Sequence, residues 1–227
     1  MTNPKTPDAE SGAKPAGSGP IPIKRGELTG FAAATYVPRR GRGARHYEDP
    51  FSWSLWICKV DPDLGRVWAF DHAKAVAELV PEGTELIACP PPGRRRSARG
   101  WYLAEALAAA VARRLDLPLA RPLRWIAEGA EASKDLARQG GKGRALARQA
   151  VCDEDLTGVT VCVVDDLFTT GITVEKTAEA LREAGAVWPV GIATLGATER
   201  TETRPDDERD RIKQRARRKR ARREVTP

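Results

Sequence analysis

Two adjacent acids stand at the end of an apolar stretch, and a short threonine-rich turn follows them. From the acids to the end of the turn the residues are Asp165, Asp166, Leu167, Phe168, Thr169, Thr170, Gly171, Ile172 and Thr173. Glycine permits a positive φ and a close backbone approach, and the N–H groups of such a turn at a helix N-terminus bind anions. Because neighbouring carboxylates accept hydrogen bonds from a diol, the pattern predicts a site for a ribose 5-phosphate.

An apolar strand that ends in two acids also occurs in Walker-B elements and in phosphoacceptor domains. A Walker-B element needs a phosphate loop of the type G-x-x-x-x-G-K-[ST] elsewhere in the chain. The sequence contains no such loop. A turn with a purely structural role would need neither the acid pair nor three threonines, so the ribose-phosphate interpretation is favoured.

The stretch 161–173, Val-Cys-Val-Val-Asp-Asp-Leu-Phe-Thr-Thr-Gly-Ile-Thr, resembles the motif that binds phosphoribosyl pyrophosphate in type I phosphoribosyltransferases. The resemblance implies that Asp165 and Asp166 bind the ribose hydroxyls and are the catalytic residues. It assigns the 5′-phosphate to Thr169, Thr170, Gly171 and Thr173, and it places Leu167 and Phe168 among the substrate-binding residues. It also implies a Mg²⁺ ion held mainly by ligand and water oxygens, with no metal-ligating residue of the protein.

A basic segment precedes the first long helix that the sequence predicts. It runs from Pro90 to Trp101 as Pro-Pro-Pro-Gly-Arg-Arg-Arg-Ser-Ala-Arg-Gly-Trp. This layout resembles the ComF-like branch of the family, in which an Arg-Gly-aromatic step opens a helix. Arginine pairs well with phosphate oxygens, so the candidates for binding pyrophosphate are Arg94, Arg95, Arg96 and Arg99. A solvated basic loop is the alternative.

Segment 134–148 combines three glycines with Lys142, Arg144 and Arg148. Family members close a loop of this kind over the reacting centre, and Lys142 would then face the ligand. An ordinary exposed glycine-rich loop is the alternative.

The elements that must position these residues alternate between strand and helix. Apolar alternation predicts a strand over 51–58, and Asp71 is expected to cap a helix that carries Ala73 to Val80. Further strands are expected over 84–89, 159–164 and 190–195, and further helices over 101–115 and 174–184. This order predicts an α/β fold with a parallel sheet flanked by helices, a small N-terminal hood region and disordered tails.

Three regions follow from the composition. Residues 1–26 are rich in Pro, Gly and Ser and are expected to be disordered, and residues 27–198 form the phosphoribosyltransferase-like domain. The C-terminal tail, 199–227, is basic: ten Lys or Arg and two acids between 209 and 227 give +8, against +7 for the whole chain, which leaves −1 for the rest. The tail can bind nucleic acid through phosphates.

The expected partners are phosphoribosyl pyrophosphate and a nitrogenous base, which the residues do not identify, and a homodimer is compatible with the pattern. No segment resembles a signal peptide, and the apolar run 106–112 is far shorter than the roughly 20 residues of a membrane span, so the cytoplasm is expected. The function that the resemblance implies is phosphoribosyl transfer. The alternatives are a non-catalytic ComF-like sensor that acts in DNA uptake or nucleic-acid handling, and a hydrolase that removes phosphoribosyl groups.

Overall fold

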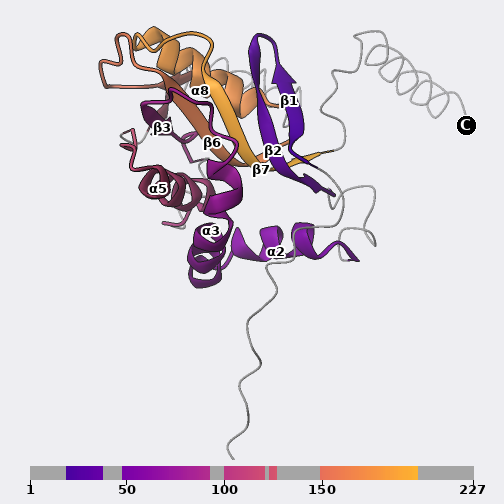
Figure 1. The fold of residues 1–227 in the computed structure, drawn as a ribbon. Helices are drawn as coiled ribbons and strands as arrows, with labels where there is room; N and C mark the ends of the chain where they lie inside the picture. Colours follow the sequence, from indigo (N-terminus) through magenta and orange to yellow (C-terminus); the bar gives the residue numbers. More distant parts are fainter. Residues whose placement is uncertain (1–18, 38–47, 93–99, 121–122, 127–148, 199–227) are drawn as a thin grey trace, which may run out of the picture.

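The computed structural model describes residues 19–37, 48–92, 100–120, 123–126 and 149–198 (Figure 1). In chain order the elements are β1 (Ile21–Arg25), β2 (Leu28–Tyr36), α2 (Pro50–Cys58), α3 (Pro62–Ala77), β3 (Leu86–Ala88), α5 (Leu103–Leu115), β4 (Arg124–Ile126), β5 (Gln149–Val151), β6 (Val161–Phe168), α8 (Ile172–Glu183) and β7 (Gly191–Thr198).

The main sheet has five strands in the order β1-β2-β7-β6-β3. Strands β2, β7, β6 and β3 are parallel to their neighbours, and only β1 pairs in the antiparallel sense, with β2. The short strands β4 and β5 form a separate antiparallel pair. The sheet is therefore mixed but mostly parallel, which confirms the predicted fold class.

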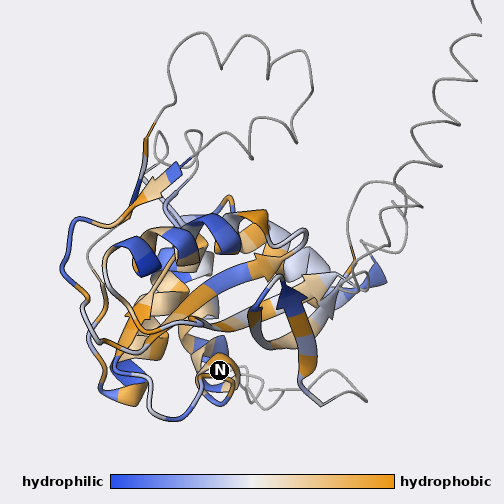
Figure 2. Cartoon of the chain, turned by 90° about the horizontal axis from the view of Figure 1, so that it is seen from above, coloured by the Kyte–Doolittle hydropathy of each residue, from blue (hydrophilic) through white to orange (hydrophobic). Residues whose placement is uncertain are grey.

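Helices cover both faces of the main sheet, as Figure 1 shows. On one face α8 packs through Val174 and Leu181 against Val163 and Ile192 of the central strands. On the other face α3 and α5 pack against a second set of strand residues, among them Cys162, Val164, Ala193 and Leu195. The central strands are thus buried on both sides, as is usual for parallel strands. Figure 2 shows hydrophobic residues on the strands in the middle of the molecule.

The N-terminal part of the fold differs from the prediction in two ways. Residues 21–25 form the edge strand β1, although residues 1–26 were expected to be disordered. Residues 51–58, predicted to be a strand, form helix α2. The buried residues Ser52, Leu55 and Cys58 recur every third position, which is a helical spacing, so the apparent alternation of apolar residues was misleading.

Both N-terminal helices begin with the same pair of residues, Asp-Pro. The Asp49 carboxylate accepts a hydrogen bond from the N–H of Ser52, and Pro50 occupies the first turn of α2. Asp61 caps α3 in the same way, with Pro62 after it, so this helix begins well before Asp71, where the sequence predicted its cap. Proline is favoured as the first residue of a helix, because a backbone N–H at that position would have no partner within the helix.

The elements β3, α5, β6, α8 and β7 lie where the sequence predicts them, with shifted ends, whereas β2, β4 and β5 were not predicted. Strand β6 continues beyond the predicted end at Val164, so Asp165 and Asp166 belong to the strand and do not follow it. The region expected to form an N-terminal hood contributes β2 to the main sheet and α2 to its surroundings. Within the described ranges, no helix has the length and apolar composition that crossing a bilayer requires.

Candidate functional site

The carboxyl ends of β2, β7, β6 and β3 share one edge of the sheet because these strands run in the same direction. Tyr36 pairs with Thr198 at the ends of β2 and β7, and Ala88 at the end of β3 pairs with Val163 of β6. Ligands of open α/β sheets bind beyond this edge. The turn after β6 and the segment after β3 therefore lie where a ligand is expected.

The turn after β6 has the backbone that an anion site needs. Thr169 and Thr170 are exposed, and Gly171 has φ 71°, in the left-handed region. A Cβ on Gly171 would lie 2.6 Å from Cζ of Phe168, so no larger residue fits here. Gly171 is also the N-cap of α8, and none of the described side chains caps this helix end, so the first N–H groups of α8 are available to a ligand.

The two acids are buried in the sheet just before this turn. Oδ1 of Asp165 accepts a hydrogen bond of 2.8 Å from the backbone N–H of Asp166. Oδ1 of Asp166 lies 2.9 Å from Nζ of Lys59, the residue that ends helix α2. A buried carboxylate is costly unless a charge or hydrogen bonds compensate it, and Lys59 supplies that charge to Asp166.

Lys59 and Tyr36 are site residues that sequence reasoning missed. Tyr36 ends β2, and the pKa of its phenol is raised first by burial and then by the negative charge of Asp166. Both residues come from the part of the chain before residue 60, far in sequence from the acids. No local pattern marks either residue, so no signal in the sequence could have paired them with Asp166.

Helix α2 is held near each of its ends by a hydrogen bond to a neighbouring segment. Near its start, the hydroxyl oxygen of Ser52 accepts a hydrogen bond of 2.8 Å from the N–H of Val37, directly after β2. At its end, the carbonyl of Cys58 accepts a hydrogen bond of 3.0 Å from Nε1 of Trp101. A Cβ on Gly65 would overlap the Trp101 ring, so the ring packs closely against the start of α3.

The segment after β3 passes close to the acids and is joined to the β4–β5 pair. The pKa of the Cys89 thiol is raised to about 12 by burial, with further contributions from the charges of Glu105 and Asp165. Nε1 of Trp125, in β4, donates a hydrogen bond of 2.9 Å to the carbonyl of Pro91. This hydrogen bond joins the β4–β5 pair to the segment after β3.

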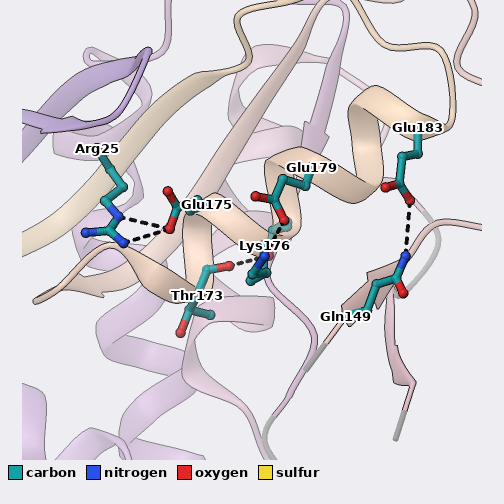
Figure 3. A network of polar contacts seen from close by, with 8 residues as sticks. Arg25, Gln149, Thr173, Glu175, Lys176, Glu179 and Glu183 are labelled. Carbon is teal, nitrogen blue, oxygen red and sulfur yellow. Dashed lines mark hydrogen bonds and ion pairs between the residues drawn. The ribbon is translucent and has the colours of Figure 1, made fainter. Parts of the chain in front are cut away.

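Polar contacts follow helix α8, and one of them, between Arg25 and Glu175, lies at its N-terminal end beside the turn after β6 (Figure 3). The guanidinium of Arg25, at the end of β1, is 2.9 Å from Oε2 of Glu175 in the first turn of α8. The Cβ of Arg25 is also close to the position that a Cβ on Gly171 would take. Strand β1 therefore brings a cation to the N-terminal end of the helix that follows the turn.

The predicted site residues fall into two groups. The structure brings together at the sheet edge Asp165, Asp166, Leu167, Phe168, Thr169, Thr170, Gly171 and Thr173. The side chain of Phe168 is buried in the core, so Phe168 can contribute to ligand binding only through its backbone. The side chain of Leu167 is half-buried against the core on the opposite face. Arg94, Arg95, Arg96, Arg99 and Lys142 lie outside the described residues, as do segment 134–148 and the tail 199–227.

Comparison with solved structures finds several phosphoribosyltransferases. An adenine phosphoribosyltransferase from Thermoanaerobacter pseudethanolicus has 17% identity over 60% of this chain and 82% of its own, with a TM-score of 0.37. A purine phosphoribosyltransferase from Pyrococcus horikoshii has 18% identity over 76% and 84%, with a TM-score of 0.33. An orotate phosphoribosyltransferase from Aeropyrum pernix has 19% identity over 73% and 80%, with a TM-score of 0.33.

No curated protein sequence matches this chain. The family model of the phosphoribosyl transferase domain, in contrast, matches residues 102–217, slightly more than half of the chain. The matched span contains the acids in β6, the turn after them and the helix α8. By this match the chain belongs to the phosphoribosyl transferase domain family.

Proposed function

We propose that this chain binds phosphoribosyl pyrophosphate at the carboxyl edge of the sheet and transfers its phosphoribosyl group to a nitrogenous base. One observation carries the proposal: a buried acid pair in a central parallel strand is followed at once by an open, glycine-containing turn that begins a helix. The turn offers N–H groups and threonine hydroxyls to the 5′-phosphate, and the acids offer acceptors to the ribose hydroxyls. Membership of the family supports the same reaction class.

In this reaction a ring nitrogen of the base forms a bond to C1 of the ribose, and the bond from C1 to pyrophosphate breaks. The pyrophosphate leaves with the bonding electrons, and positive charge develops on the ribose ring. The turn 169–173 fixes the sugar by its phosphate, which converts binding energy into orientation. The negative charges of Asp165 and Asp166 lie near the ring and favour the developing positive charge.

The donor set at the site suits a Mg²⁺ ion that is held mainly by its ligand. Among the described residues no group of three or more His, Cys, Asp or Glu side chains could enclose a metal ion. Asp165 and Asp166 are hard oxygen donors, and Mg²⁺ commonly keeps its waters and binds one or two carboxylates together with substrate phosphates. The ion would supply charge neutralisation to the leaving pyrophosphate.

The ComF-like assignment and the identity of the base are finer parts of the proposal. The Arg-Gly-Trp step at residues 99–101 supports the ComF-like branch, because α5 begins directly after it, at Leu103. In that branch a non-catalytic sensor of phosphoribosyl pyrophosphate is the second candidate function, with the basic tail binding nucleic acid. Phosphoribosyl pyrophosphate and a nitrogenous base, as the proposed ligands, are compatible with the cytoplasmic location that the sequence predicts.

Release of pyrophosphate separates the transferase from the sensor and from the hydrolase. The purified chain is incubated with phosphoribosyl pyrophosphate, Mg²⁺ and one of a panel of purine, pyrimidine and related bases, and free pyrophosphate is measured. A transferase releases pyrophosphate with one base or a few related ones and yields the matching nucleotide. Binding of phosphoribosyl pyrophosphate without release for any base would favour the sensor, and release without a base would favour a hydrolase.

Binding of nucleic acid by the basic tail is tested separately, with the full chain and with a chain that ends at Thr198. The +8 charge of residues 209–227 predicts that only the full chain is retained by RNA or DNA, and that added salt weakens the retention steeply. Equal retention of both chains would contradict a role for the tail.

A further inference from the structure

Lys59 forms an ion pair with Asp166, one of the two acids that are expected to bind the ribose hydroxyls. Its Nζ lies 2.9 Å from Oδ1 of Asp166, and the exposed fractions of the two side chains are 19% for Lys59 and 3% for Asp166. The carboxylate is therefore almost fully enclosed, while the lysine retains access to the solvent from which a ligand arrives. An ammonium has three N–H donors, so it can donate to a second anionic group while it stays paired with Asp166.

The backbone of Lys59 is fixed, so this contact is a built part of the site. Lys59 follows α2 directly, and the neighbouring carbonyl of Cys58 accepts the hydrogen bond from the Trp101 indole. The other end of α2 is joined to Val37 through Ser52, beyond the carboxyl end of β2. These contacts hold the lysine between the acid in β6 and the start of α5.

Lys59 lies outside the part of the chain that matches the family model, which begins at residue 102. The N-terminal segment thus adds a cation to a site whose acids and turn come from the matched part. A lysine side chain loses considerable rotamer freedom when it is held in one position. A bound ligand that uses the remaining donors would offset that cost.

We propose that Lys59 binds the ligand together with Asp166, with its ammonium donating to an oxygen of the pyrophosphate next to the ribose diol. This inference rests on the proposed function. Asp166 accepts hydrogen bonds and so suits a hydroxyl, whereas the ammonium only donates and so suits an anionic oxygen. In phosphoribosyl pyrophosphate the pyrophosphate is attached to C1, adjacent to the hydroxyl on C2. These two groups of the ligand are therefore close enough together for Lys59 to contact the pyrophosphate while Asp166 contacts the hydroxyl.

A comparison of phosphoribosyl pyrophosphate with ribose 5-phosphate tests whether Lys59 contacts the pyrophosphate or only neutralises Asp166. Ribose 5-phosphate has the same phosphate and diol but no pyrophosphate. If Lys59 contacts the pyrophosphate, its removal weakens binding of phosphoribosyl pyrophosphate selectively. If Lys59 only positions Asp166, both ligands lose affinity equally, and if it blocks the diol position, both gain affinity.

Calorimetric titration of the full chain tests the inference. Lys59→Met removes the charge and keeps a similar length, Lys59→Arg keeps the charge, and Lys74→Met removes an exposed lysine of α3 as the matched control. We expect Lys59→Met to weaken binding of phosphoribosyl pyrophosphate about 10- to 100-fold, the range of a charge-assisted hydrogen bond. Binding of ribose 5-phosphate should change by less than about threefold, and Lys74→Met should behave as the wild type.

The outcomes distinguish failure of this inference from failure of the proposed function. Equal changes for the two ligands in Lys59→Met, with both still bound by the wild type, would overturn the inference and leave the function standing. A wild-type chain that binds neither ligand would overturn both. Recovery of most of the affinity in Lys59→Arg would support a charge contact.

A measurement on the unaltered chain covers the case in which Lys59→Met does not fold. Lysines are acetylated briefly with acetic anhydride, and the modification of each is read by peptide mass spectrometry. Phosphoribosyl pyrophosphate should reduce acetylation of Lys59 at least about fivefold more than ribose 5-phosphate does, and Lys74 should not change with either. Equal acetylation of Lys59 with both ligands would contradict the contact with pyrophosphate.

Discussion

The guanidinium of Arg25 and the carboxylate of Glu175 lie 2.9 Å apart and connect the edge strand β1 to the first turn of α8 (Figure 3). About a quarter of each side chain is exposed, 26% for Arg25 and 28% for Glu175. A carboxylate near a helix N-terminus is favourable for the helix but repels a phosphate bound at the same end. Arg25 therefore balances a charge that would oppose the proposed binding of a phosphate.

Replacement of Arg25 by Met should weaken binding of phosphoribosyl pyrophosphate by about threefold to tenfold, because the charge of Glu175 is then uncompensated near the phosphate turn. The same change should lower the free energy of unfolding by no more than about 1 kcal/mol, as for a partly exposed ion pair. Titration calorimetry and urea denaturation measure the two effects. The double variant Arg25→Met with Glu175→Gln should recover the affinity, and a double variant as weak as Arg25→Met would show that Arg25 acts by another route.

Gly171 should not tolerate a side chain. Gly171→Ala places a residue at φ 71° and brings its Cβ within 2.6 Å of the Phe168 ring, so we expect a loss of about 2–4 kcal/mol in unfolding free energy. Gly83→Ala is the matched control, since Gly83 has φ 79° and nothing within 4 Å of the added Cβ. It should lose only the backbone cost, about 1 kcal/mol. Equal losses in the two variants would contradict the close contact with Phe168.

The stretch from β6 to α8 could be predicted because local sequence determines it. Four apolar residues indicate a buried strand, and Gly171 marks the positive φ before a helix. The prediction for 51–58 was wrong because Phe51, Trp53, Leu55 and Ile57 alternate as in a strand. The helix start signal is Asp49 followed by Pro50. The same signal at Asp61 and Pro62 would have placed the start of α3 correctly.

The contacts around Asp166 could not be predicted in this way. Lys59 and Tyr36 reach the acid only because β2 lies beside β7 and α2 packs across the end of that strand. Such long-range arrangements are set by the packing of the whole sheet, and a single sequence carries no periodic or motif signal for them. The arginines at 94, 95, 96 and 99 and Lys142, in contrast, stay predictions from the sequence.

Replacement of Trp101 by Phe should affect the site through Lys59. The ring is kept, but the hydrogen bond to the Cys58 carbonyl is lost, which we expect to cost about 1 kcal/mol in unfolding free energy. The looser end of α2 should weaken binding of phosphoribosyl pyrophosphate by at least about threefold. Trp188→Phe is the control, because it removes an indole hydrogen bond to Glu27 near the start of β7, at the opposite end of that strand from the site edge. Equal affinities of the two variants would indicate that Trp101 does not position the lysine.

The raised pKa of Cys89 predicts how the free energy of unfolding depends on pH. Burial and the charges of Glu105 and Asp165 raise the pKa of Cys89 from its ordinary value of 9.0 to about 12. Between these values the unfolded thiol ionises while the folded one keeps its proton, so the folded state binds more protons and loses stability as the pH rises. The free energy of unfolding should fall more steeply above pH 9 for the wild type than for Cys89→Ala. Parallel curves for the two chains would contradict a protonated, buried thiol.

The central claim is that the acid pair and the turn bind phosphoribosyl pyrophosphate. Titration calorimetry with Mg²⁺ compares the wild type with the double variant Asp165→Asn and Asp166→Asn, and thermal unfolding of both checks that the variant is folded. We expect the wild type to bind phosphoribosyl pyrophosphate and the folded double variant not to bind it. Retained affinity in the double variant, or no binding by the wild type, would contradict it.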